Sequence, residues 1–525
     1  MASAAESAEA LRQGEQGRLD ALKSAKERNR LGQFATPNRL AVEMARYALR
    51  LWGGRDEKVR FLDPSIGTGS FFSALRQVFP AGAIAGASGV EIDPSFAQAA
   101  SVLWEPLGLA VTTADFTRLP PPPSGVRPNL VLANPPYVRH HHLGQDEKRR
   151  LKELVRQGQG IEISGLAGLY GYFLLLADTW LEDGGLAFWL IPSEFMDVNY
   201  GAAIKEYLTE RVKLLHIHRF CPSDVQFFDA LVTSAVVIFE KSPPTAEQTV
   251  RFSFGGSLLE PDTSEFVPSG VLRTARKWTN YPSTRPVVAT FGPRDAILGD
   301  LFTIRRGQAT GSNSFFILPR DEALRSGIPA EFLKPILPSP RHLRTPIVEA
   351  GPGGFPLVEK PLGLIDCHLT EDEIRRRYPA FWAYLESGAD LGVNKGYLAS
   401  RRTPWYSQEK REPPPFVCTY MGRQREGRSP FRIIWNKSRA TAANVYLMLY
   451  PKGMLRRALD ARPDLYPVVF SLLQDIKAHS FIDEGRVYGG GLHKMEPKEL
   501  AFLPAQAIVD AIGQPPAARQ ATLSF

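Results

Sequence analysis

The chain is poor in cysteine and has no long apolar run. Its three cysteines, Cys221, Cys367 and Cys418, lie far apart in 525 residues and show neither zinc-binding nor redox spacing. Neither a disulfide framework nor a cysteine-bound metal is therefore expected. No apolar stretch reaches the length of a membrane span, and the polar N-terminal segment lacks the apolar core of a signal peptide. A reduced, cytoplasmic setting without membrane attachment is expected.

Acidic residues are too few to balance the basic ones. The chain has 63 Lys and Arg against 55 Asp and Glu, a net charge of +8. The segment 395–439 alone holds eleven Lys and Arg and three Glu, a local charge of +8. Such a concentration favours a polyanionic partner at this segment, although a solvated surface loop explains the charge equally well.

The length and the residue pattern indicate more than one domain, because 525 residues exceed what a single core usually holds. Residues 1–30 are typical of a polar helix. In 31–245, apolar β-rich runs such as "VRFLD", "NLVLAN" and "GLAFWLIP" alternate with helical patterns. This alternation predicts an open, mostly parallel sheet with helices on both faces. Residues 246–295 are expected to connect it to a second domain, 296–525.

Acidic residues end three successive predicted strands. Asp63 precedes the loop "PSIGTG", Glu91 lies 24 residues after Gly67, and Asp115 follows the third strand. The carboxyl ends of parallel strands meet at one edge, where a carboxylate can hold both hydroxyls of a ribose. Asp63 can face an amino group, and Asp115 and Phe116 can bind an adenine ring. This rim suits S-adenosylmethionine better than a phosphate ligand; NAD is the alternative.

The sequence "NPPY", residues 134–137, ends the fourth predicted strand. The side-chain oxygen of Asn134 and the carbonyl of Pro135 can accept the two N–H bonds of an aromatic amino group and aim its lone pair at a methyl donor. Tyr137 offers a stacking face, worth about 1–3 kcal/mol per base. An Asn-Pro turn would explain the motif in isolation, but its position after three cofactor-binding strands favours a catalytic site.

The ordered motifs "GQFATP", "DPSIGTGSFF", "GVEID", "ADF", "NPPY" and "GLYGYF" resemble those of the gamma-class, TaqI-like and Eco57I-like, DNA adenine-N6 methyltransferases. The resemblance covers about residues 30–245 and continues more loosely to the C-terminus. It implies a Rossmann-like S-adenosylmethionine-dependent methyltransferase domain in 31–245 and a C-terminal mixed α+β target-recognition domain in 296–525. The cofactor-binding residues that it implies are Thr36, Pro37, Asp63, Pro64, Gly67, Glu91, Ile92, Asp115, Phe116 and Phe173. The catalytic residues that it implies are Asn134, Pro135, Pro136, Tyr137 and Phe228.

The resemblance also implies roles for these residues. Residues 36–37 border the methionine moiety, and Ile92 lies against the cofactor adenine. Phe173 packs near that adenine or in the core. Phe228, or its neighbour Phe227, forms the second wall around a flipped target adenine.

The expected reaction is direct methyl transfer to the N6 atom of an adenine, without a metal, in a restriction-modification or related defence system of a bacterial or archaeal cell. The expected partners are double-stranded DNA and a separate cognate restriction endonuclease, with the chain acting as a monomer. One alternative is the same chemistry on RNA or on a protein glutamine. The other is a non-catalytic DNA-binding specificity or regulatory subunit, against which the intact Asn134, Glu91 and Asp115 argue.

Overall fold

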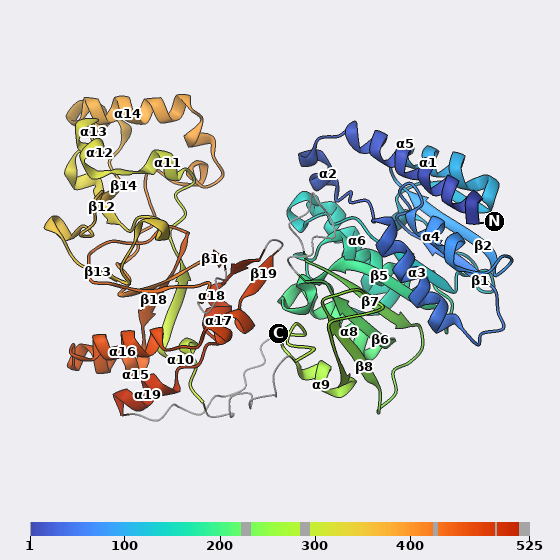
Figure 1. The fold of residues 1–525 in the computed structure, drawn as a ribbon. Coiled ribbons are helices and arrows are strands. Elements are labelled where there is room, and N and C mark those ends of the chain that lie inside the picture. The colour runs from blue at the N-terminus through green and yellow to red at the C-terminus, as the bar shows by residue number, and fades with distance from the viewer. Residues whose placement is uncertain (1, 222–232, 284–294, 424–428, 489–490, 514–525) are drawn as a thin grey trace. The chain divides into compact units, whose positions relative to one another are not determined.

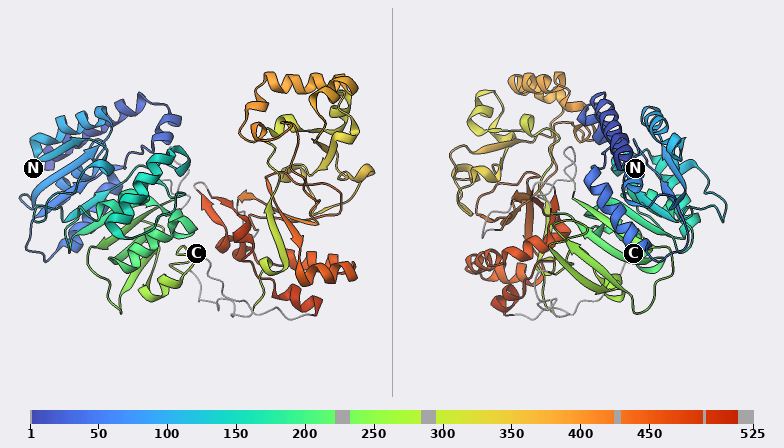
Figure 2. Two further views of the ribbon diagram at one scale, coloured as in Figure 1. Left: turned by 180° about the vertical axis from the view of Figure 1, so that it is seen from behind. Right: turned by 45° about the vertical axis from the view of Figure 1, so that its right-hand side comes forward.

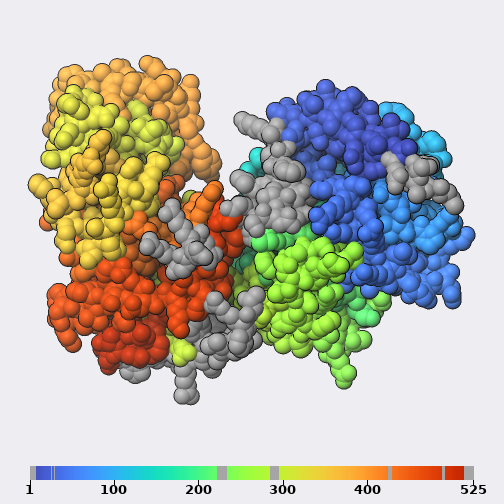
Figure 3. Space-filling view, viewed as in Figure 1, coloured from blue at the N-terminus to red at the C-terminus, as the bar shows by residue number. Residues whose placement is uncertain are grey.

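The computed structural model describes residues 2–221, 233–283, 295–423, 429–488 and 491–513. The chain forms two compact units, built mainly from residues 1–288 and 289–525. The first runs from blue to green and the second from yellow to red (Figures 1 and 3). Within the described ranges no helix has the length and apolar character needed to cross a membrane.

A nine-stranded sheet with the order β3-β2-β1-β4-β5-β7-β6-β8-β9 forms the centre of the first unit. Its parallel part consists of β3 (Leu109–Thr113), β2 (Ile84–Glu91), β1 (Val59–Asp63), β4 (Leu130–Ala133) and β5 (Leu186–Pro192). Next come β7 (Ser234–Glu240), antiparallel to both its neighbours, then β6 (Lys213–Arg219), β8 (Thr249–Phe254) and β9 (Thr263–Pro268). Every residue of β4 and β5 is buried, as expected for parallel strands covered on both faces.

Helices cover both faces of this sheet (Figures 1 and 2), because right-handed crossovers that leave the centre in opposite directions place their helices on opposite sides. One group comprises α3 (Asn38–Trp52), α4 (Ser70–Val78) and α5 (Pro94–Trp104), over which α1 (Ala2–Ala21) packs against α4 and α5. The other comprises α6 (Gln145–Gln159), α7 (Leu169–Ala177) and α8 (Ala202–Glu210). The short helices α2 (Ala25–Leu31) and α9 (Ser269–Thr274) complete the unit.

Part of the segment expected to be a connection belongs to the sheet. Within residues 246–295, β8 pairs with β6 and β9 pairs with β8. The first compact unit correspondingly extends to Val288.

The second unit has three small sheets. The five-stranded sheet has the order β10 (Phe302–Arg306), β18 (Tyr446–Pro451), β15 (Phe416–Thr419), β17 (Ile433–Asn436) and β13 (Ile347–Val348). One three-stranded sheet consists of β11 (Ile317–Pro319), β14 (Leu362–Ile365) and β12 (Leu333–Ile336), and the other of β16 (Met421–Arg423), β20 (Leu492–Lys494) and β19 (Arg486–Tyr488).

The helices of the second unit pack around two main cores. One core includes buried residues of β10, β15 and β18 and of the helices α10 (Leu298–Leu301), α15 (Gly453–Ala461), α16 (Leu465–Gln474), α17 (Ala478–Glu484), α18 (Pro497–Leu500) and α19 (Gln506–Ile512). The other includes residues of α11 (Asn313–Phe316), α12 (Arg320–Arg325), α13 (Glu371–Arg377) and α14 (Pro379–Asp390). The predicted fold class, a mostly parallel α/β domain followed by a mixed α+β domain, is thus confirmed.

Candidate active site

The strand order reverses between β1 and β4, and in open α/β sheets ligands bind outside the carboxyl ends of the strands at such a point. Asp63 is the last residue of β1, Glu91 is the last residue of β2, and Asn134 directly follows β4. The Ser65 hydroxyl donates to the backbone oxygen of Asn134 over 3.1 Å and joins the loop after β1 to the "NPPY" segment. The sheet therefore brings the predicted cofactor carboxylates to the same edge as the predicted catalytic amide.

Both carboxyl groups are buried and held by local donors. Asp63 is 2% exposed and accepts a hydrogen bond from the Ser65 N–H over 3.0 Å. Glu91 accepts from the N–H groups of Gly67, over 3.0 Å, and Asp93, over 2.9 Å. Burial raises the pKa of Asp63 to about 8, and the nearby charge of Glu91 adds to the rise. Burial also raises the pKa of Glu91, against the effect of its backbone hydrogen bonds.

A positive charge would complete this site. The groups with the largest effects on the pKa of Asp63 and of Glu91 include no cation, and a buried carboxylate without a counter-charge is unfavourable. Next to them, Ile92 is 65% exposed and offers an apolar surface. Gly67 has a positive φ of 53°, and a Cβ there would meet nothing within 4 Å. The site therefore fits a ligand with a cationic group, hydroxyls and an apolar ring, which S-adenosylmethionine has.

The aromatic residues predicted near the cofactor adenine lie together. Phe116 and Phe173 are buried, with ring centroids 5.3 Å apart, and Trp180 lies 5.0 Å from Phe116. Asp115 precedes this cluster, and its carboxylate accepts a hydrogen bond from the Arg118 guanidinium over 3.2 Å. Asp115 therefore already has a charged partner, in contrast to Asp63 and Glu91. The sequence did not indicate Trp180, whose helical spacing looks like that of a core residue.

The side-chain amide of Asn134 has a fixed orientation. Its Nδ2 donates to the backbone oxygen of Phe34 over 2.9 Å and to the Thr36 hydroxyl over 3.1 Å. A carbonyl oxygen can only accept, so the amide cannot be turned over without losing the bond to Phe34. The opposite atom, Oδ1, is buried and meets no donor within the described chain. Asn134 thus presents an unpaired acceptor beside the cofactor loop, and the "FATP" segment holds it in place.

Tyr137 is tied to the sheet as well as to the motif. It is 7% exposed, its hydroxyl donates to the backbone oxygen of Leu190 over 3.1 Å, and its ring centroid lies 5.7 Å from that of Phe34. Burial raises the pKa of its hydroxyl well above the ordinary value. Phe228 and its alternative Phe227 lie outside the described residues.

The four prolines among the predicted site residues differ in exposure. Pro64 and Pro135 are buried, Pro136 is half-buried, and Pro37 is the exposed residue that precedes α3.

The sequence did not show that α1 helps to hold the cofactor loop. The Arg12 guanidinium donates to the Thr68 hydroxyl over 3.0 Å, and that hydroxyl donates to the Gln16 side chain over 2.7 Å. The Trp104 Nε1–H donates a hydrogen bond to the backbone oxygen of Thr68 over 2.8 Å. Arg12 is only 3% exposed and forms an ion pair with the equally buried Glu9.

Glu9 is ionised in this buried network. Burial opposes its charge, but hydrogen bonds from Arg12 and Ser73 outweigh that effect and hold the pKa of Glu9 below its usual value. Further along, Lys23 pairs with Asp93, two residues after Glu91. The N-terminal helical segment therefore contacts both loops that carry the predicted cofactor residues.

Known proteins resemble the chain along most of its length. Residues 129–228 match the family described as Eco57I restriction-modification methylase, and residues 275–521 match the C-terminal domain of Type II methyltransferase M.Eco57I. The chain is 28% identical over 492 residues to Type II methyltransferase M.XamI of Xanthomonas campestris pv. amaranthicola, covering 90% of this chain and 85% of that protein. It is 25% identical over 495 residues to M.AccI of Acinetobacter calcoaceticus, covering 91% and 85%.

A solved structure shows the fold. The Type IIL restriction-modification enzyme MmeI, solved in complex with DNA, is 12% identical and has a TM-score of 0.54 over 84% of this chain and 65% of that one. The first unit has the class I fold of S-adenosylmethionine-dependent methyltransferases. The predicted resemblance to the Eco57I-like gamma-class methyltransferases of restriction-modification systems is thus confirmed.

Proposed function

We propose that the chain is a site-specific DNA adenine methyltransferase that transfers a methyl group from S-adenosylmethionine to the N6 atom of a flipped adenine in duplex DNA. The observation that carries this proposal is the anchored amide of Asn134, whose Oδ1 is buried and unpaired at the switch point of the sheet. An acceptor in this position suits an amino group, which has N–H bonds to donate.

The cofactor site is assigned on its charge and shape. We expect Asp63 to face the amino group of the methionine moiety and Glu91 to hold the ribose hydroxyls. Ile92, Phe116 and Phe173 would border the adenine. When bound, S-adenosylmethionine supplies an electrophilic methyl group on a positively charged sulfur.

The residues after β4 position the nucleophile. The Asn134 Oδ1 and the Pro135 carbonyl accept the two N–H bonds of the target amino group, which draws the nitrogen towards tetrahedral geometry and aims its lone pair at the methyl group. Because Phe34 and Thr36 fix the other end of the Asn134 amide, little freedom is lost when the base arrives. Tyr137 and Phe228 hold the two faces of the flipped adenine, whose extrusion costs a few kcal/mol.

The second unit recognises the duplex in this proposal, and the restriction-modification setting follows the relatives named as Type II methyltransferases. Methylation would protect host DNA from a separate endonuclease of the same specificity. The chain would act as a monomer, since one target adenine needs one site.

The test is methyl transfer by the purified chain, with labelled S-adenosylmethionine and with duplex DNA, RNA or a glutamine peptide as acceptor. Digestion of the DNA to nucleosides should yield N6-methyldeoxyadenosine. Asn134→Ala should lower the rate about 100-fold or more, as when one group that stabilises a transition state is removed. It should still bind the cofactor, as judged by a thermal shift. Label in RNA or peptide but none in DNA would overturn the proposal.

A further inference from the structure

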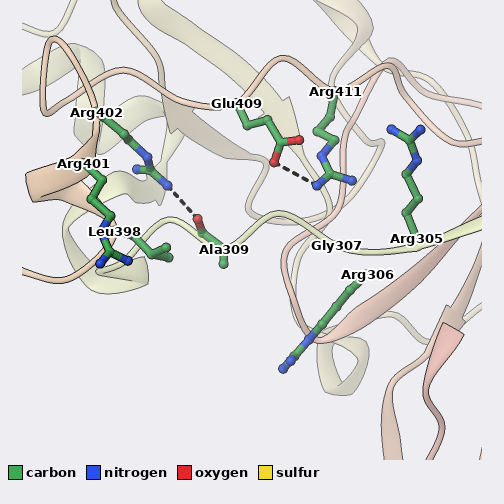
Figure 4. A pocket seen from close by; sticks show the side chains of 9 residues that line it. All are labelled: Arg305, Arg306, Gly307, Ala309, Leu398, Arg401, Arg402, Glu409 and Arg411. Atoms are coloured by element: carbon green, nitrogen blue, oxygen red, sulfur yellow. Dashed lines mark hydrogen bonds and ion pairs between the residues drawn. The ribbon is translucent and has the colours of Figure 1, made fainter. Parts of the chain in front are cut away.

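A hollow in the second unit is lined by arginines from three segments (Figure 4). β10 supplies Arg305 and Arg306, residues 399–402 supply Arg401 and Arg402, and the following loop supplies Arg411. Gly307, Ala309 and Leu398 also line it. One carboxylate, Glu409, belongs to the lining, so the hollow has a large excess of positive charge. Clustered guanidinium groups repel one another unless an anion lies between them.

Most of these guanidinium groups are held in place. Arg402 donates to the backbone oxygens of Ala309, over 2.8 Å, and Thr310, over 2.9 Å. The guanidinium carbon of Arg306 lies 4.1 Å from the Tyr420 ring centroid.

Arg401 and Arg411 are held in a similar way. Arg401 lies 3.7 Å from the Tyr397 ring centroid, and Arg411 donates to Glu409 over 2.8 Å. An array of cations that is already ordered loses little side-chain freedom when it binds.

Arg411 has donors that lack an acceptor. Its Nε and Nη1 atoms are buried and meet no hydrogen-bond partner within the described chain, although buried guanidinium donors are usually satisfied. The charges of Arg305 and Arg411 both act on Tyr450. An oxygen-rich anion would supply the missing acceptors, because guanidinium groups bind phosphate through parallel N–H bonds.

We propose that this arginine hollow binds backbone phosphates of the DNA duplex and so positions the second unit on its substrate. The proposal rests on the proposed function in so far as the ligand is DNA. The number of cations favours phosphates over base edges, because one guanidinium satisfies the two acceptors of a guanine, whereas successive phosphates can occupy several. Contacts of this kind set position and affinity without reading sequence.

The experiment measures the affinity of the full chain for two fluorescent duplexes from 50 to 200 mM salt. One duplex contains the sequence that the protein methylates, and the other lacks it. The variant is Arg305→Gln/Arg411→Gln. Its matched control is Arg456→Gln/Arg457→Gln, which removes two charges from the exposed face of α15 in the same unit. A charge-keeping variant, Arg305→Lys/Arg411→Lys, tests whether an altered fold causes the effect.

Each lost phosphate contact lowers the slope of log affinity against log salt by about 0.9. Over this salt range the wild type should therefore lose about tenfold more affinity than the double Gln variant, on both duplexes alike. The Lys variant and the α15 control should keep the wild-type slope.

Two results would overturn the inference: equal slopes for the Gln variant and its control, or a loss confined to the duplex that carries the site. If the wild type neither bound nor methylated any duplex, the proposed function itself would fail. That outcome is distinct from a wild type that methylates DNA and is insensitive to these substitutions.

Discussion

The Asp63 carboxyl should make the unliganded protein less stable as the pH rises, and Asp63→Asn should remove this dependence. In the unfolded chain the group ionises near its usual pKa of 3.8, whereas in the fold burial, with a contribution from Glu91, raises its pKa to about 8. Between these values the folded protein retains a proton that the unfolded chain has lost. The folded state is therefore favoured below pH 4, and its advantage is lost progressively as the pH rises towards 8.

The size of the effect follows from this shift. One group contributes a slope of about 1.4 kcal/mol in the free energy of unfolding per pH unit. From pH 5 to pH 7 Asp63 should therefore destabilise the wild type by about 3 kcal/mol relative to Asp63→Asn. The asparagine oxygen can still accept the hydrogen bond from the Ser65 N–H, so the comparison isolates the charge.

The assay is urea unfolding followed by tryptophan fluorescence at pH 5, 6, 7 and 8, without cofactor. Other titrating groups are common to both proteins, so they cancel in the difference. Asp146→Asn is the control, because the Asp146 side chain is 94% exposed. A wild-type-to-variant difference that stays constant from pH 5 to pH 7 would refute the reasoning about Asp63.

The same pair of proteins tests the assigned cofactor contact. S-adenosylmethionine brings an ammonium group that can pair with the ionised carboxylate, so it should stabilise the wild type much more than Asp63→Asn at pH 7. Equal stabilisation of the two would show that Asp63 does not receive this group.

Three further predictions concern groups near the site and in the sheet. Arg12→Met, which removes a donor to the cofactor loop, should raise the KM for S-adenosylmethionine about five- to tenfold with little change in kcat. Arg18→Met, on the exposed face of the same helix, should change neither, and a fall in kcat alone would contradict this role. Tyr137→Phe should lower the free energy of unfolding by about 1 kcal/mol with near-normal methylation, whereas Tyr137→Ala should reduce methylation strongly and spare cofactor binding. Burial lowers the pKa of His216 and of His218 to about 3. Lowering the pH from 7 to 5 should therefore reduce the free energy of unfolding by about 2 kcal/mol for each histidine. A His216→Gln/His218→Gln variant whose free energy of unfolding falls as much as that of the wild type would refute this.

Much of the first unit could be predicted from periodicity and strand-end chemistry. The run "VRFLD" coincides with β1, and "GLAFWLIP" contains β5, because strands buried on both faces read as unbroken apolar runs. Asp63, Glu91 and Asn134 gather at one edge because parallel strands end there. The placement of these residues needed only the order of the strands.

The strand β6 was missed because its sequence, "KLLHIHR", looks half polar. His216 and His218 are nevertheless buried, and each bonds to the hydroxyl of Ser253 on the neighbouring β8, over 2.7 Å and 2.8 Å. A hydroxyl can donate to one ring nitrogen and accept from the other. This pairing exists only once the two strands are adjacent, so neither strand reveals it alone.

The polar helix α1 is a similar case. Glu9 and Arg12 look like a solvated pair three residues apart, yet both are buried against α4. Their burial is tolerated because each also bonds to a hydroxyl, that of Ser73 or Thr68. The arginine hollow was also beyond sequence reasoning, because its members come from segments about a hundred residues apart.

Methylation of adenine in duplex DNA by a site that depends on Asn134 is tested most directly by single-molecule sequencing of genomic DNA from a methylation-deficient host that expresses the chain. We expect N6-methyladenine at one sequence motif, and none in cells that express a folded Asn134→Ala variant at the same level. An unmodified genome in cells that contain folded wild-type protein, or modification that persists in the variant, would contradict it.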